Sequence, residues 1–245
     1  MVNSDYSNPV TKSRLALALD VDDLVVGARL ARELQPYFGI LKIGLELYSA
    51  AGPEVIGTFQ QMGYKIFLDL KLHDIPNTVQ RAARVLGSLG VNYLTLHTAG
   101  GKEMVSAGVE GLLEGARNAG IGAPIALGVT ILTSDSITDE ELMQDRIRIA
   151  KDSGCRGIVC SAHDLHVVAK TTPDLITVVP GIRPSGVDSH DQKKVATPAK
   201  AIDGGASILV IGRAVTQAMD PVQASQGIHT ELEHVSQHLE EIHHK

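Results

Sequence analysis

The chain has 245 residues, of which 44% are hydrophobic and 20% are charged, as expected of a globular protein with a sizeable core. Its formal net charge of −6 and the absence of a basic run argue against binding to nucleic acid or to an anionic membrane. The start MVNSDYSNPVTKS lacks the apolar segment of a signal peptide, and no run of about 18 apolar residues could span a bilayer. We therefore expect a cytoplasmic protein.

Eight short apolar runs alternate with helical patterns along the chain, which indicates right-handed βαβ units and a parallel sheet. The runs are LALALD (15–20), GILKIGLE (39–46), KIFLDLKL (65–72), YLTLHTA (93–99), PIALGVTIL (124–132), GIVCSA (157–162), ITVVPGI (176–182) and SILVIGRA (207–214). Eight units in this length predict an α/β fold, a single (β/α)8 TIM barrel over residues 1–245. Residues 1–13 would form a polar N-terminal extension, and 228–245 an acidic, histidine-rich C-terminal helix.

The alternation within the runs predicts which side chains face the barrel interior. Leu15, Leu17 and Leu19 share one face of the first strand, and Asp20 falls on the other. In a barrel the larger aliphatic face packs under the helices, and the small or polar face points inward. The inward polar groups come at the carboxyl ends of the strands, where barrel active sites lie.

The densest polar signal is FLDLKLHDIPNTV (67–79). Asp69 and Lys71 are two residues apart on a strand and so point to one side, Asp74 follows where the strand ends, and Lys42 has the same parity on the preceding strand. Gathered charges of alternating sign are costly to desolvate unless they pair. They indicate a reactive site, the alternative being a salt-bridge network that only closes the top of the barrel.

This motif resembles the signature of the orotidine 5′-phosphate decarboxylase family, D-x-K-x-x-D followed by I-P-x-T, which DLKLHDIPNT matches. Further residues follow in the family's order between about residues 15 and 220. They are Asp20, Lys42, Thr133 in LTS, Arg183 in PGIR, Gln192, and Gly212 and Arg213 in IGR. The core motif alone is less specific, because related sugar-phosphate decarboxylases and aldolases share it.

The resemblance implies decarboxylation of orotidine 5′-monophosphate to UMP and CO2, the last step of de novo pyrimidine synthesis, without cofactor or metal. Lys71 would stabilise the C6 carbanion and protonate it. Lys42 and Asp69 would hold Lys71 in place and keep it charged, with Asp69 near the departing carboxylate. Asp74 would complete the same charge network in the neighbouring subunit, so the functional unit would be a homodimer.

The substrate contacts are likewise implied by the resemblance. Asp20 and Lys42 would contact the ribose hydroxyls, Thr133 the pyrimidine, and Thr78 the neighbouring subunit's site. The phosphate would be held by four residues near the last two strands, of which Gly212 permits close backbone approach and Arg213 supplies a forked donor. They are Arg183, Gln192, Gly212 and Arg213. Without the family context, Arg183 and Gln192 would read as surface residues, and Thr133 as a helix cap.

Two rival functions stay open from the sequence. One is a Mg²⁺-dependent sugar-phosphate decarboxylase or hexulose-phosphate synthase of the same barrel group; the other is a barrel that binds a phosphometabolite without turnover. The histidines add no catalyst: His97 is expected to line the mouth or pack, and the His234/His238 pair, although spaced for zinc, to lie on a solvated helix. The two cysteines, Cys155 and Cys160, read as buried and reduced.

Overall fold

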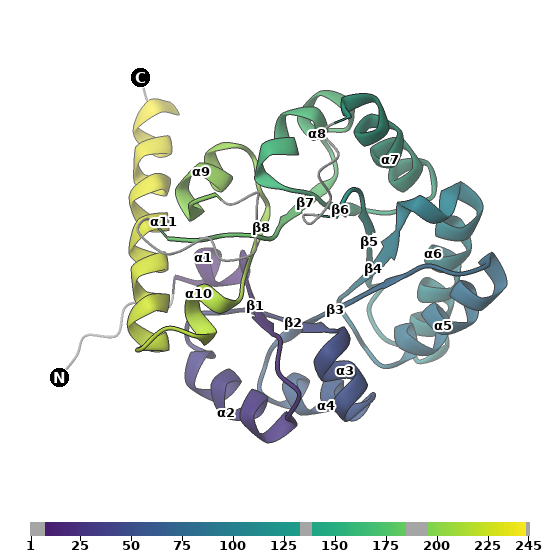
Figure 1. Ribbon diagram of the computed structural model, residues 1–245, viewed down its shortest axis with the longest axis horizontal. Coiled ribbons are helices and arrows are strands. Elements are labelled where there is room, and N and C mark those ends of the chain that lie inside the picture. Colours follow the sequence, from purple (N-terminus) through teal and green to yellow (C-terminus); the bar gives the residue numbers. More distant parts are fainter. Residues whose placement is uncertain (1–7, 133–138, 185–195, 244–245) are drawn as a thin grey trace.

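The structure is a computed structural model that describes residues 8–132, 139–184 and 196–243, with side chains as far as residue 233. Eight parallel strands form one closed ring in sequence order, β1 to β8, with β8 pairing back onto β1 (Figure 1). The strands are β1 (Leu15–Leu19), β2 (Ile40–Gly44), β3 (Lys65–Leu72), β4 (Tyr93–His97), β5 (Ile125–Val129), β6 (Gly157–Val159), β7 (Ile176–Val179) and β8 (Ile208–Ile211). This ring confirms the predicted (β/α)8 barrel.

Helices surround the ring: α1 precedes β1, α10 and α11 follow β8, and the other helices lie between consecutive strands (Figure 1). They are α1 (Pro9–Ser13), α2 (Leu24–Leu34), α3 (Leu45–Ala51), α4 (Glu54–Gln61), α5 (Pro76–Ser88), α6 (Gly101–Asn118), α7 (Glu140–Asp152), α8 (Leu165–Thr171), α9 (Pro198–Asp203), α10 (Arg213–Thr216) and α11 (Pro221–His243), with short 3₁₀ turns η1 (Thr98–Gly100) and η2 (Ala162–Asp164). None of the helices in the described part is long and apolar enough to cross a membrane.

The hydrophobic core has two layers, as the alternation predicts. Leu15, Leu17 and Leu19 are fully buried between β1 and the outer helices. A separate inner cluster, which includes Ala16 and Phe67, fills the barrel. Because Ala16 and Ala18 on β1 are small, the barrel interior has room between Phe67 and the carboxyl ends of the strands.

Helices α5 and α6 touch along their backbones because glycines line the contact. A Cβ added at Gly111 would collide with the backbone oxygen of Gln80, and one at Gly115 with that of Arg84. On the other helix, a Cβ at Gly87 would collide with the Leu112 oxygen. This close packing fixes α5, the helix that directly follows the D-x-K-x-x-D segment.

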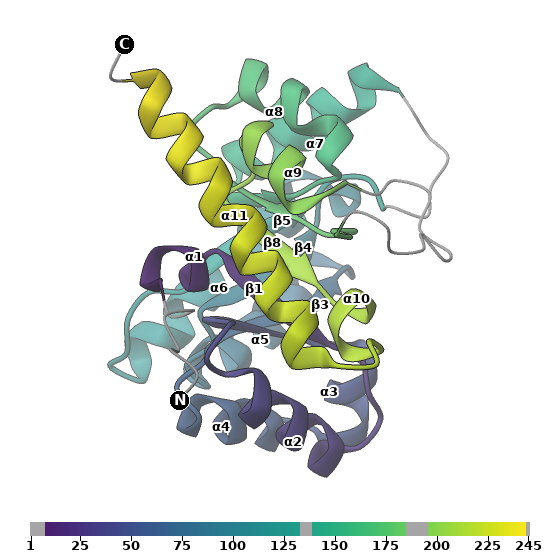
Figure 2. The ribbon, with the colours of Figure 1, turned by 90° about the vertical axis from the view of Figure 1, so that its left-hand side faces the viewer.

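The C-terminal helix α11 begins at Pro221, earlier than the expected residue 228, and packs against α1, α2, α9 and α10 on the outside of the barrel (Figure 2). His229 is fully buried there, and its Nε2–H donates to the Tyr37 carbonyl oxygen at 2.8 Å. Because a carbonyl only accepts, this bond fixes the neutral tautomer with the proton on Nε2. Part of the expected N-terminal extension also folds, since Pro9–Ser13 form α1.

Candidate active site

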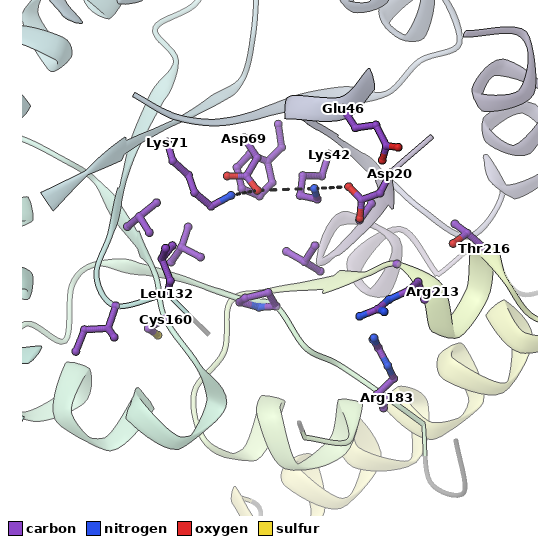
Figure 3. Close-up of a pocket in the computed structure, with 18 of the residues that line it drawn as sticks. Asp20, Lys42, Glu46, Asp69, Lys71, Leu132, Cys160, Arg183, Arg213 and Thr216 are labelled. Carbon is purple, nitrogen blue, oxygen red and sulfur yellow. Dashed lines mark hydrogen bonds and ion pairs between the residues drawn. The ribbon is translucent and has the colours of Figure 1, made fainter. Parts of the chain in front are cut away.

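A cavity of about 510 Å³ opens at the carboxyl ends of the strands, where the sequence predicted the site (Figure 3). Its polar wall on β1, β2 and β3 carries Asp20, Lys42, Asp69 and Lys71. The facing wall, from the ends of β7 and β8, carries two arginines, Arg183 and Arg213. Between them lie apolar side chains, namely Ala18, Phe67, Val129, Ile131, Leu132, Val159, Pro180 and Val210. The cavity thus offers a charged rim, an apolar centre and a cationic end.

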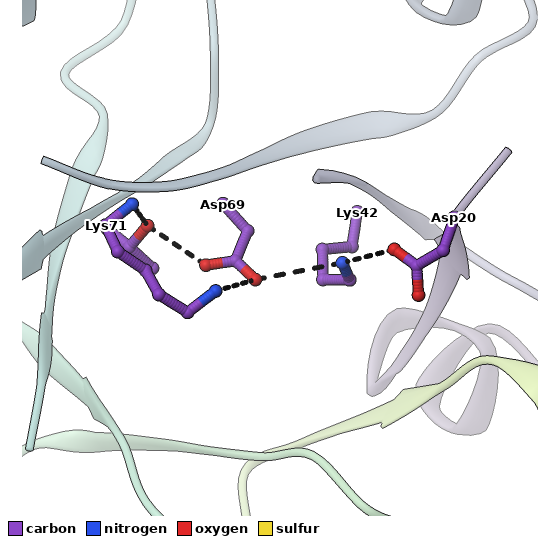
Figure 4. Close-up of polar contacts among 5 residues, drawn as sticks. Asp20, Lys42, Asp69 and Lys71 are labelled. Carbon is purple, nitrogen blue, oxygen red and sulfur yellow. Dashed lines mark hydrogen bonds and ion pairs between the residues drawn. The ribbon is translucent and has the colours of Figure 1, made fainter. Parts of the chain in front are cut away.

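The four charges of the polar wall form one alternating row (Figure 4). Lys42 Nζ lies 3.1 Å from Asp20 Oδ1 and 3.7 Å from Asp69 Oδ2. The same Asp69 oxygen accepts a hydrogen bond from Lys71 Nζ at 2.9 Å. The Lys42 and Asp69 side chains are only 11% and 13% exposed, whereas that of Lys71 is 33% exposed. The row therefore holds Lys71 from one side and leaves its ammonium accessible from the cavity.

The backbone at Lys71 departs from a regular strand. Its φ of 48° makes it the one non-glycine residue with positive φ in the described part of the chain. Between the pairs Leu68↔Leu94 and Leu72↔Leu96, β3 advances by 72 − 68 = 4 residues and β4 by 96 − 94 = 2. Such an irregularity redirects side chains next to a site. Asp69 and Lys71 do face the same cavity, but through this distorted backbone and not through the simple alternation that predicted it.

A buried threonine holds the distortion in place. Thr95 Oγ1 accepts from the Lys71 backbone N–H at 2.8 Å and donates to Asp69 Oδ1 at 3.1 Å. One hydroxyl therefore fixes both the backbone of the lysine and the orientation of the carboxylate that pairs with it. Thr95 alternates with Leu94 and Leu96 along β4, but nothing in the sequence assigns it this role.

The cationic end is built by the chain leaving β7 and β8. The Arg183 residue is 5% exposed and lines the cavity, so it is not a surface arginine. Gly212 precedes α10 and lines the cavity, and because it has no side chain its backbone is accessible from there. Arg213 follows as the first residue of α10. Two guanidinium groups beside an open helix start are suited to binding a phosphate monoester.

Three lining residues escaped the sequence analysis. Glu46 lies in the first turn of α3, because β2 ends at Gly44, two residues before the end of the apolar run from which a strand was expected. Thr216 and Gln217 line the cavity from the end of α10. Glu46 was missed because the strand gives way to the helix two residues earlier than the hydrophobic pattern suggests.

The remaining predicted site residues lie elsewhere. Asp74 and Thr78 are exposed and do not line this chain's cavity, so Asp74 is not part of its own chain's charge row. The Asp74 carboxylate accepts from the neighbouring Ile75 N–H at 2.6 Å. Thr133 and Gln192 fall outside the residues that the structure describes.

Cys160 and His97 lie near the cavity mouth, and their surroundings indicate structural roles. Burial, with the nearby Asp164 carboxylate, raises the pKa of the Cys160 thiol, so this cavity-lining sulfur stays protonated and is a weak nucleophile. His97 Nδ1 accepts from the Ala99 N–H at the start of η1, and its ring stacks on His73 with centroids 5.5 Å apart. Among the described residues, no group of three or more His, Cys, Asp or Glu side chains is arranged to hold a metal ion.

Fold and site together have the layout of a (β/α)8-barrel enzyme, in which the ends of several strands supply the reacting groups and strands seven and eight a phosphate site. The chain belongs to the orotidine 5′-phosphate decarboxylase / HUMPS family, whose model matches residues 13–228.

Relatives and solved structures agree with this assignment. An orotidine 5′-phosphate decarboxylase of Moorella thermoacetica is 41% identical over 239 residues, 91% of this chain and 94% of that protein. One from Lactiplantibacillus plantarum is 45% identical over 203 residues, 78% of this chain and 86% of that protein. The crystal structure of the Lactobacillus acidophilus orotidine 5′-phosphate decarboxylase is similar with a TM-score of 0.75 and 35% identity, covering 89% of this chain and 98% of that one.

Proposed function

We propose that this protein decarboxylates orotidine 5′-monophosphate to UMP. The observation that carries the proposal is the pairing of Lys71 with Asp69 in a cavity whose opposite wall presents Arg183 and Arg213. A phosphorylated nucleotide would place its phosphate at the arginines and its pyrimidine over the apolar centre, next to the Lys71 ammonium. The relatives named above support the choice of substrate.

The reaction breaks the bond between C6 and the carboxylate carbon, and the electron pair stays on C6 as CO2 leaves. No ring orbital delocalises that pair, so a fixed positive charge must stabilise it. Lys71 supplies this charge and then transfers a proton from Nζ to C6, giving UMP and a neutral amine that takes up a proton from solvent. The Lys71 side chain is one-third exposed, which supports its reprotonation by solvent. Its hydrogen bond to Asp69 supports a fixed position for the ammonium.

The ribose is assigned to the opposite end of the charge row. Asp20 is 55% exposed at the cavity rim and accepts from Lys42 Nζ, so a carboxylate and an ammonium are offered side by side. Such a pair can accept from one hydroxyl of a diol and donate to the other. For the residues outside the described part, Thr133 is proposed to contact the pyrimidine and Gln192 the phosphate, on the family resemblance alone.

The working unit is proposed to be a homodimer in the cytoplasm, with Asp74 and Thr78 of each chain completing the partner's site. Support comes from their exposure beside Ile75, which is itself 65% exposed. Mixing Lys71→Ala with Asp74→Ala protein tests this, because a mixed dimer regains one intact site. The mixture should recover about a quarter of wild-type activity, since about half the dimers are mixed and half their sites are intact. No recovery after subunit exchange would refute the shared site.

The test of the function itself is a spectrophotometric decarboxylation assay with orotidine 5′-monophosphate, with and without EDTA. Turnover that survives chelation supports the proposal and excludes the Mg²⁺-dependent rival of the same barrel group. Binding of the nucleotide without turnover would instead indicate a non-catalytic barrel.

A further inference from the structure

The N-terminus of α9 is held by a carboxylate from the C-terminal helix. Glu231 on α11 is half-buried, and its Oε1 accepts from the Ala199 N–H at 3.0 Å. The Lys200 N–H, next along the first turn, donates to Thr197 Oγ1 at 3.2 Å, and Pro198 has no N–H. A negative charge at this place also interacts favourably with the helix dipole. Glu231 therefore completes the cap that α9 could not complete from its own residues.

The chain just before α9 supports the arginine end of the cavity. Ala196 pairs with Ile182 in a parallel bridge, in which Arg183 N–H donates to the Ala196 oxygen at 2.9 Å and Ala196 N–H to the Gly181 oxygen at 3.3 Å. The backbone that carries Arg183 is thus bonded directly to a segment that ends in the α9 cap. Only two residues, Thr197 and Pro198, lie between Ala196 and Ala199, so a loss of the bond at Ala199 is passed on to Ala196 through a short stretch of backbone.

We propose that Glu231 is a positioning residue for the phosphate end of the cavity, acting through Ala199 and Ala196 on Arg183. The inference rests on the proposed function only in taking the arginine end as the phosphate site. Removing the carboxylate leaves the Ala199 N–H without its partner and loosens the segment that pairs with Arg183. The Lys42, Asp69 and Lys71 row stands on β2 and β3, on the other side of the barrel, and is untouched by the change (Figure 3).

Helix α11 itself does not depend on Glu231 for its attachment. Ile228 and Leu232 are buried in the core, and His229 is bonded to Tyr37. Loss of one partly exposed carboxylate should therefore leave the helix docked. This separates a positioning effect at the cavity from general loss of structure.

The experiment compares Glu231→Ala with Glu231→Gln, whose amide oxygen can still accept from Ala199, and with Glu233→Ala, which removes a carboxylate from the same helix but has no hydrogen bond to a described residue. Three quantities are measured: kcat/KM for orotidine 5′-monophosphate, kcat/KM for orotidine, which lacks the phosphate, and the Kd of inorganic phosphate by calorimetry. The phosphate measurement does not require turnover, so it tests the inference even if the proposed decarboxylation fails.

For Glu231→Ala we expect kcat/KM for the nucleotide to fall, and the Kd of phosphate to rise, about fivefold, the size of effect that loss of one cap supports. Turnover of orotidine should stay within about twofold because no phosphate contact is involved. Glu231→Gln should recover most of the loss, and Glu233→Ala should resemble the wild type. Equal losses on both substrates, or an unchanged phosphate Kd, would overturn the inference.

Discussion

Replacing Lys71 by alanine is the most direct test of the charge row. The substitution removes the ammonium that lies 2.9 Å from Asp69, while Lys42 remains 3.7 Å from the same carboxylate oxygen. The bonds of Thr95 to the residue 71 backbone N–H and to Asp69 do not involve the lysine side chain, so the local backbone should persist. The variant is therefore expected to fold and to retain its phosphate site.

The loss of rate can be built from two effects. Removing a fixed charge or donor at a developing anion typically costs about 10²–10³ in kcat. Removing the group that transfers the proton costs about 10²–10⁴ more. Together they predict a fall of about 10⁴–10⁷, or roughly 5–10 kcal/mol of transition-state stabilisation. KM should change far less, because the arginine end of the cavity is unaltered.

The assay follows the change in pyrimidine absorbance under single-turnover conditions, which separates chemistry from product release. Lys65→Ala is a matched control, since Lys65 is the exposed first residue of the same strand, at the end away from the cavity. If Lys71→Ala retained kcat within about tenfold of the wild type, the proposal that Lys71 stabilises the C6 carbanion would be wrong.

Three further outcomes are expected. Arg213→Ala should lower kcat/KM for the nucleotide by about 10–10³-fold with little effect on a phosphate-free substrate, measured by steady-state kinetics. Burial lowers the pKa of His229, so the unfolded chain binds a proton at higher pH than the folded chain does. The free energy of unfolding should therefore fall as the pH drops below about 6.5, by at most about 1.4 kcal/mol per pH unit. His229→Gln, which keeps a donor for the Tyr37 oxygen, should flatten this pH dependence in urea denaturation, and an unchanged slope would contradict the argument. Gly115→Ala should reduce the unfolding free energy by about 1–3 kcal/mol because its Cβ meets the α5 backbone, whereas Gly57→Ala, with open space around it, should be neutral or slightly stabilising.

Much of the barrel could be predicted because its strands follow simple rules. The run at 65–72 matches β3 in full, and the alternation of large and small residues on β1 gives the correct outer and inner layers. Both of these predictions depend on local periodicity, which a sequence displays directly. Asp69 and Lys71 were also expected in one cavity because they share parity on one strand; they do line it together, but the distorted backbone at Lys71, and not the alternation, brings this about.

What the sequence could not supply depends on contacts between distant segments. The bond between Thr95 and the Lys71 backbone joins two strands through a register shift that no hydrophobic pattern records. Glu46 was concealed because a strand and the helix after it share one apolar run, and the boundary falls inside that run. The capping of α9 by Glu231 joins residues 32 positions apart and has no signature in either segment.

The left-handed backbone at residue 71 sets stability and reactivity against each other at a single position. A lysine with φ of 48° is less favourable there than glycine or asparagine, which adopt this conformation more readily. A library of variants screened only for heat resistance should therefore enrich glycine or asparagine at this position and lose the amine that we propose as the proton donor. Thermostable variants of this barrel have to be selected with turnover in the screen.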